Sequence, residues 1–365
     1  MKNKKGMSFQ TVLMVIAVIG LTISLIVFFP NTANAKDSFF NLLGLGSTCR
    51  ETGESYQKHL HDLQQAILKE DYEKTAELYE IMKRCFSRRE NDIKKEAMDS
   101  FNAYVEKVDR VIDGDGFLAI FRFMKNTIGT GLKETDKLKR LVRNAYLDAI
   151  KKRLDKINEY RSKAESPPAD FESSGYSYTN HDGDWAYILD CCIFAGGTEI
   201  IGQREFEKLK ALCQEGIEYQ EIKTRIKLDC DEKIRQANSS LRAIDCLYET
   251  AIGIHWLNEC ENTDYSVSDR ISYCVEAYTH YGLILGKYRG YTECDSSVNN
   301  ANAKVSMVLA TIARLDPKKP PINYVCGYIF DELNRWRVIP NNVYYTCRYL
   351  KRINIECIPC ELVPA

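Results

Sequence analysis

The stretch Lys137–Tyr160 has the sequence KLKRLVRNAYLDAIKKRLDKINEY. Its apolar residues recur mostly at spacings of three or four: Leu138, Leu141, Ala145, Ala149, Leu154 and Ile157. Such spacing places them on one face of a helix, with the charged residues on the other faces. Similar stripes recur along most of the chain, and strand-like alternation does not. We therefore predict an all-α fold built from antiparallel helical hairpins.

The same stretch carries most of the positive charge of the molecule. Residues 117–163 hold 13 Lys and Arg against 5 Asp and Glu, a net charge of +8, whereas the whole chain of 365 residues has a net charge of -1. The predicted basic surface consists of Lys137, Lys139, Arg140, Arg143, Lys151, Lys152 and Arg153.

This basic surface has two interpretations. It is either a solvated helix face or an electrostatic surface that meets a partner. The partner would be anionic lipid headgroups, an acidic envelope polymer, or the acidic carboxy-terminal half of the same chain, because residues 164–365 carry a net charge of -8. Nucleic acid is not predicted as a partner, because few aromatic residues are interleaved with these cations.

Residues 37–160 form the first predicted domain, in which a helical hairpin precedes two further helices. Leu60, Leu63, Ala66 and Ile67 share one face, Lys69–Asp71 interrupts the pattern, and Tyr72, Ala76, Tyr79 and Met82 continue it. The second half of the hairpin resembles the second helix of a tetratricopeptide repeat, with Thr75 and Tyr79 at its small and aromatic positions. No 34-residue period follows, so the resemblance, over residues 55–86, implies one repeat-like hairpin.

Cys49 and Cys85 flank this hairpin. A bridge between them would close a loop of about 37 residues and stabilise the fold by roughly 4 kcal/mol. The alternative is a pair of buried free thiols.

Asp113–Gly116 reads DGDG and invites comparison with a calcium loop. An EF-type loop with Gly116 at its sixth position would need an acid at Val111 and a glutamate at Arg122. Because neither is present, we predict a turn between helices.

Residues 161–184 are rich in Pro, Ser, Gly and Asp and are predicted to be a linker before a cysteine-rich helical domain over residues 185–365. The predicted helices of this domain are Trp185–Phe194, Phe206–Ala237, Leu241–Leu257, Ser268–Tyr288, Val298–Arg314, Tyr324–Trp336 and Val343–Lys351. The chain has 22 tyrosines, which are suited either to a packed core or to a contact surface.

Twelve of the 14 cysteines lie in this domain: Cys191, Cys192, Cys213, Cys230, Cys246, Cys260, Cys274, Cys294, Cys326, Cys347, Cys357 and Cys360. Their separations, often 14 to 20 residues, match helix lengths. We therefore predict disulfides between helices in an oxidising compartment, with a connectivity that spacing alone leaves open.

Cys357-Ile358-Pro359-Cys360 has the spacing of a thiol-disulfide exchange motif. Such motifs normally begin a long helix, and only five residues follow here, so structural disulfides are the preferred interpretation. The alternatives are redox activity and half of a metal site, although no histidine pair has the matching spacing. We predict no catalytic residues, no resident metal and no cofactor.

The amino terminus determines the predicted compartment. Residues 1–10 form a basic leader, and Thr11–Phe29 runs 19 residues without a charge, long enough to span a bilayer as a helix. The lysines before it favour a cytoplasmic amino terminus, which places the rest of the chain outside. Cleavage after Ala35, in the small-residue sequence Ala33-Asn34-Ala35, would instead release a secreted protein.

Lys4-Lys5-Gly6 directly before the apolar run resembles the type IV pilin-like (class III) signal peptides of archaeal surface proteins. The resemblance implies cleavage after Gly6 and retention of the apolar helix. Thr11 stands where bacterial pilins have a glutamate, so filament assembly is an open question.

Together these features predict a single-pass, membrane-anchored extracytoplasmic helical protein, with the lipid bilayer as one partner and a protein or envelope component as another. Its predicted role is structural or binding, with a pilin-like subunit as one form and no enzymatic activity. The alternative is a secreted thiol-disulfide oxidoreductase or metal-binding protein that uses Cys357 and Cys360.

Overall fold

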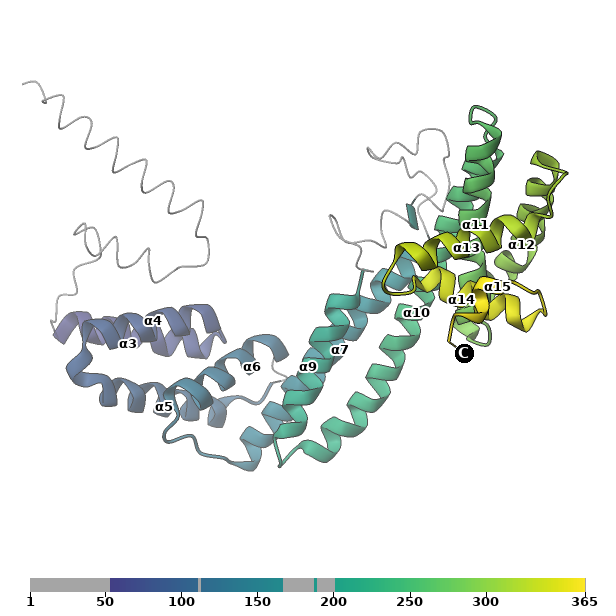
Figure 1. Ribbon diagram of the computed structural model, residues 1–365. Helices are drawn as coiled ribbons and strands as arrows, with labels where there is room; N and C mark the ends of the chain where they lie inside the picture. The colour runs from purple at the N-terminus through teal and green to yellow at the C-terminus, as the bar shows by residue number, and fades with distance from the viewer. Residues whose placement is uncertain (1–52, 111–112, 167–186, 189–200, 365) are drawn as a thin grey trace, which may run out of the picture. The chain divides into compact units, whose positions relative to one another are not determined.

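The computed structural model describes residues 53–110, 113–166, 187–188 and 201–364 (Figure 1). All regular structure in these residues is helical, which confirms the all-α prediction. Several predicted features lie outside the described residues: the leader, the apolar segment Thr11–Phe29, Gly6, Ala35, Cys49, Cys191 and Cys192. None of the helices that are described is both long enough and apolar enough to cross a bilayer.

The chain divides into two compact units. The described part of the first unit is residues 53–104 and 123–132, and the second unit contains residues 105–122 and 133–365. This division differs from the predicted boundary near residue 160, because helix α7 (Asp136–Glu165) belongs to the second unit and extends into the predicted linker. The apolar stripe of α7 packs on helices that follow the linker in the sequence.

The first unit contains a helical hairpin of α3 (Gly53–Leu68) and α4 (Tyr72–Cys85). The predicted face of Leu60, Leu63, Ala66 and Ile67 is buried, as are Thr75 and Tyr79 of α4. Tyr72 departs from the predicted pattern and is 41% exposed. The predicted interruption is a turn in which Glu70 has a φ of 58° and the side chain of Asp71 caps α4 by accepting from the amide of Lys74.

After this hairpin come η1 (Ser87–Arg89), α5 (Glu90–Lys107) and the short π-helical turn η2 (Met124–Ile128). Cys85, at the end of α4, is disulfide-bonded. Cys49, its predicted partner, lies outside the described residues.

The second unit begins with α6 (Gly114–Phe123), whose last residue falls in the first unit, and α7. It continues with α9 (Gln203–Glu218), α10 (Lys223–Glu261), α11 (Val267–Lys287), η3 (Thr292–Cys294), α12 (Asp295–Leu315), α13 (Pro321–Arg335), α14 (Asn341–Arg352) and α15 (Ile358–Glu361). Helices α7, α9 and α10 pack against one another (Figure 1). Every residue of the predicted α7 stripe is buried in this packing.

The break between α9 and α10 differs from the sequence prediction, which ended one helix at Ala237 and began the next at Leu241. In the structure the chain leaves the helix at Tyr219, where φ is -81° and ψ is 99°, and α10 then runs without interruption through Asn238. Small buried residues, Ala237, Ser240 and Ala243, allow α10 to pack closely there. Tertiary packing therefore outweighs the low helix propensity of the Asn-Ser-Ser sequence.

The core of the second unit is centred on α11, which packs against α10, α12 and α14. Tyr278, Tyr281 and Tyr288 are fully buried in it, so these tyrosines fill a core. Glycine lets α14 approach α11: a Cβ on Gly282 would lie 2.5 Å from Thr346 Oγ1, and one on Gly286 would lie 2.1 Å from the carbonyl oxygen of Tyr345. A side chain larger than hydrogen at either position would force the two helices apart.

Candidate functional site

The basic residues predicted along α7 fall into two groups in the structure. Lys152 and Arg153, in the carboxy-terminal half, are paired with carboxylates from other elements, and Lys139, Arg140 and Arg143, in the first two turns, line an open cleft. Of the other two, Lys137 donates to the carbonyl oxygen of Glu106 and to Asp109, and Lys151 is exposed. The predicted set is therefore not one continuous surface.

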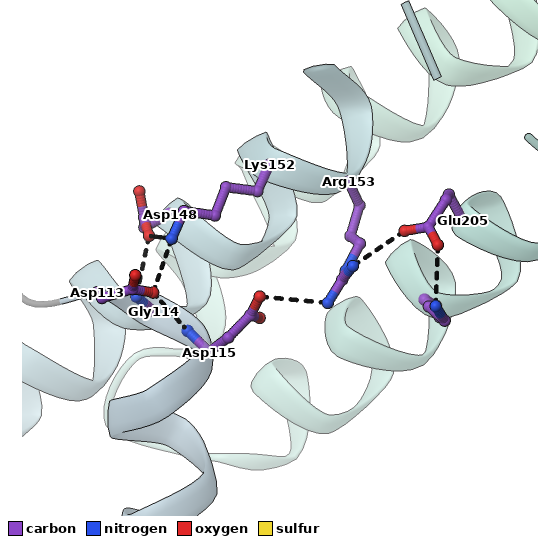
Figure 2. A network of polar contacts seen from close by, with 8 residues as sticks. Asp113, Gly114, Asp115, Asp148, Lys152, Arg153 and Glu205 are labelled. Atoms are coloured by element: carbon purple, nitrogen blue, oxygen red, sulfur yellow. Dashed lines mark hydrogen bonds and ion pairs between the residues drawn. The ribbon is translucent and has the colours of Figure 1, made fainter. Parts of the chain in front are cut away.

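The first group belongs to a polar network between the start of α6 and α7 (Figure 2). Lys152 Nζ lies 2.7 Å from Asp113 Oδ1 and 3.2 Å from Asp148 Oδ2. The amide of Gly114 donates to the same Asp148 carboxylate at 2.9 Å. The hydrogen bond from Lys152 lowers the pKa of Asp113 below its ordinary value.

Gly114 makes this junction possible, because the first turn of α6 touches the backbone of α7. A Cβ at Gly114 would lie 2.4 Å from the carbonyl oxygen of Ala145 and 2.8 Å from the amide nitrogen of Ala149. The turn predicted at DGDG is therefore wrong for three of its four residues: Gly114, Asp115 and Gly116 form the first turn of α6, which packs on α7. The side chains of Asp113 and Asp115 meet Lys152 and Arg153.

The network continues through Arg153 to α9 (Figure 2). Arg153 lies 3.2 Å from Asp115 Oδ2 and 3.0 Å from Glu205 Oε2, and Lys208 holds the other oxygen of Glu205 at 2.8 Å. Glu205 is only 7% exposed. Its burial acts to raise the pKa, but the hydrogen bonds from Lys208 and Arg153 outweigh it and lower the pKa. This pair matches the predicted alternative in which the basic stretch meets acids of the carboxy-terminal half.

The second group lines a cleft of 460 Å³ between the first turns of α7 and the start of α10. Its lining residues are Asp136, Lys139, Arg140, Arg143, Glu221, Ile222, Thr224 and Arg225. Four of these side chains are cations and two are carboxylates. Arg225 and Thr224 were not among the predicted site residues, because nothing in the sequence indicates that the start of α10 lies beside α7.

Buried residues on both sides of the α9–α10 turn hold the cleft wall in place. Tyr219 and Ile222 are buried, and the ring of Tyr219 meets Phe121 edge to face at 5.9 Å. The adjacent Glu221, Thr224 and Arg225 are exposed. Burial raises the pKa of Tyr219 to about 12, so its ring stays neutral near pH 7.

The disulfide Cys213–Cys230 links α9 to α10 across the same turn, with Cα atoms 5.8 Å apart. Both cysteines are almost fully buried. The geometry of the cleft wall is therefore fixed covalently as well as by packing.

Four more disulfides join helical elements of the second unit: Cys246–Cys294, Cys260–Cys274, Cys326–Cys357 and Cys347–Cys360. The prediction of disulfides between helices is thus confirmed in the described part of the chain. Cys357 and Cys360 of the CxxC sequence bond to different partners, on α13 and α14. Within the described residues, no group of three or more His, Cys, Asp or Glu side chains is arranged to hold a metal ion.

A smaller polar group lies between α10, α11 and α13. Nδ1 of His280 lies 2.7 Å from Glu249 Oε2, and the hydroxyl of Tyr328 donates to Glu276 Oε2 at 3.1 Å. Burial raises the pKa of Glu276, although the hydrogen bond from Tyr328 acts to lower it. These contacts join α10 and α13 to α11.

Comparison with protein-family models, curated proteins and solved structures finds no match for this chain.

Proposed function

We propose that this chain is a membrane-anchored extracytoplasmic protein that serves a structural or binding role at the cell surface. The observation that carries the proposal is the set of five disulfides in the second unit: three cross-link α9, α10, η3 and α11, and two cross-link α13 and α14 to α15. Such a density of bridges is typical of oxidising compartments outside the cytoplasm. The uncharged run Thr11–Phe29, after three lysines, supplies a means of export and an anchor.

The surfaces of the described units support binding better than catalysis. The 460 Å³ cleft is lined by four cations and two carboxylates, and a cavity of 560 Å³ between α11 and α13 is lined by residues that include Ile271, Val275 and Tyr324. None of the described residues that line them is a histidine or a cysteine, the side chains that most often serve as general base and as thiol nucleophile. A pilin-like subunit is one form of this role, and it would use the apolar segment for assembly as well as anchoring.

The test is mass mapping of the disulfides in native protein purified without reductant, with the mature amino terminus read in the same experiment. We expect the five described pairs and an amino terminus at Met7. A start at Lys36 would replace the anchored form with a secreted one. Recovery of the native protein from the cytoplasm with all its thiols titratable would overturn the proposal.

The alternative function, thiol-disulfide exchange at Cys357 and Cys360, has the CxxC spacing in its favour. Exchange within such a motif requires its two sulfurs to bond to each other, and here Cys326 and Cys347 hold them. Thiol-exchange activity that is present in the native protein and absent in the Cys360→Ser variant would favour this alternative.

A further inference from the structure

We propose that the cleft between α7 and the start of α10 binds a phosphate group carrying two negative charges. Lys139 and Arg140 are adjacent on α7, Arg143 lies about one turn further along the same side, and Arg225 lines the cleft from the first turn of α10. Asp136 and Glu221 lie at the same cleft, so the six charged side chains leave a surplus of two positive charges. The inference deepens the proposed binding role by naming its ligand chemistry.

These cations are available to a ligand, unlike their neighbours on the same helix. Within the described residues, Arg140 and Arg225 make no ion pair, and both are exposed. Lys139 reaches the fully exposed Asp136 only at 3.8 Å, and Arg143 has its polar contact with Asn144 at 3.5 Å. A surface pair of this kind contributes little and is easily exchanged for a bound anion.

The backbone at the cleft adds donors to this charge. Helix α10 is 39 residues long and begins after Ile222 without a side-chain cap, and Ile222, Thr224 and Arg225 line the cleft. The amides of an uncapped first turn are hydrogen-bond donors, and they carry the positive end of the helix dipole. The cations and the cleft define the site, and the helix start reinforces it.

Arginine side chains favour phosphate as the anion. A guanidinium group offers two parallel N–H donors that match two oxygens of a phosphate, and three arginines can surround a tetrahedral group from different sides. The surplus of two charges matches a phosphate monoester dianion or one end of a pyrophosphate. The cleft volume of 460 Å³ lies within the range of small-molecule sites, so a larger molecule can present this group.

The phosphate can come from a soluble ester or from a lipid headgroup, and the experiment separates the two. The full-length oxidised chain in uncharged detergent micelles is titrated by calorimetry with pyrophosphate, with short-chain phosphatidic acid and with succinate as a dicarboxylate control. We expect saturable binding of at least one phosphate compound, and no comparable binding of succinate. The compound that binds more tightly shows whether the phosphate comes from a soluble ester or from a lipid headgroup.

The variants make the assignment specific. The triple substitution Arg140→Gln, Arg143→Gln and Arg225→Gln should weaken binding at least tenfold, whereas Lys151→Gln, an exposed lysine of the same helix outside the cleft, should change it less than twofold. Circular dichroism and thermal unfolding establish that the triple variant is folded. If it does not fold, Arg225→Gln alone is used, with an expected weakening of at least threefold.

Three results would overturn the assignment: no binding of either phosphate compound, equal binding of succinate, or binding that the cleft variants leave unchanged. Disulfide mapping and the mature amino terminus test the proposed compartment in a separate experiment. Failure at the cleft is thereby distinguished from failure of the proposed function.

Discussion

Lys152 and Arg153, in the carboxy-terminal half of α7, meet Asp113, Asp115 and Glu205, whereas Arg140 and Arg143, in its first turns, face an open cleft. Both groups come from one helix and have the same residue types. Their difference arises elsewhere in the chain: Asp113 lies 39 residues before Lys152, and Glu205 lies 52 residues after Arg153. A run of positive charge therefore acquires a structural or a binding role from the segments that pack beside it.

The strongest test of this comparison is Gly114→Ala, which acts on the network without removing a charge. The added Cβ would meet backbone atoms of Ala145 and Ala149, which cannot move aside as a side chain can. We expect the second unit to lose about 3 kcal/mol in its free energy of unfolding, measured by urea denaturation.

Gly327→Ala is the matched control, because Gly327 lies inside α13 and nothing stands within 4 Å of its added Cβ. This change should stabilise the unit by about 0.5–1 kcal/mol, since alanine is the better helix former. Equal free energies of unfolding for the two alanine variants would contradict the close packing of Gly114 against the backbone of α7.

The second test compares arginines from the two halves of α7. Arg153→Met retains an apolar stem but leaves the buried Glu205 with Lys208 as its one remaining ion-pair partner among the described residues. We expect a loss of about 2 kcal/mol in the free energy of unfolding, below the full cost of breaking a buried pair because Arg153 is 25% exposed.

Arg140→Met should change the same free energy by less than about 0.5 kcal/mol, because Arg140 has no carboxylate partner in the described part of the chain. Equal losses in the two variants would remove the distinction between the network and the cleft.

The smallest expected effect is a dependence of the free energy of unfolding on pH, caused by the Glu205 carboxylate of the network. The folded-state pKa of Glu205 lies below its ordinary value, so its contribution to stability is fully present above the unfolded pKa and is lost as pH falls through the folded one. In Glu205→Gln we expect a deficit on the order of 1 kcal/mol at pH 7 that shrinks at pH values below about 4.5. Urea unfolding at pH 7 and pH 3.5 measures it. A deficit that is the same at both pH values would show that the charge of Glu205 is not what matters.

The helix stripes were predictable because local spacing determines them. The residues from Leu138 to Ile157 that form the α7 stripe are all buried, and the cysteines at helix-length separations do connect neighbouring helices. The first prediction depends on the 3.6-residue period and the second on cysteine separations close to one helix length, and the sequence displays both directly.

The features that the sequence did not reveal depend on long-range packing. Nothing in the sequence near Arg225 indicates that it lies beside α7. The helix break predicted at Asn238–Ser240 is absent, because small residues there pack closely within the continuous helix α10. The pairing of Cys357 with Cys326 and of Cys360 with Cys347 depends on how α13, α14 and α15 meet, and cysteine spacing does not specify it.

Those two pairings also set an order for biosynthesis. The bridges of Cys326 and Cys347 can form only after residues 357 and 360 have been synthesised, whereas the other three described bridges of the unit use cysteines no later than Cys294. Ending translation after Glu356 would delete two of the five described bridges at once and leave both upstream thiols open to mispairing with other cysteines. The short helix α15 is therefore the element on which the cross-linking of both α13 and α14 depends.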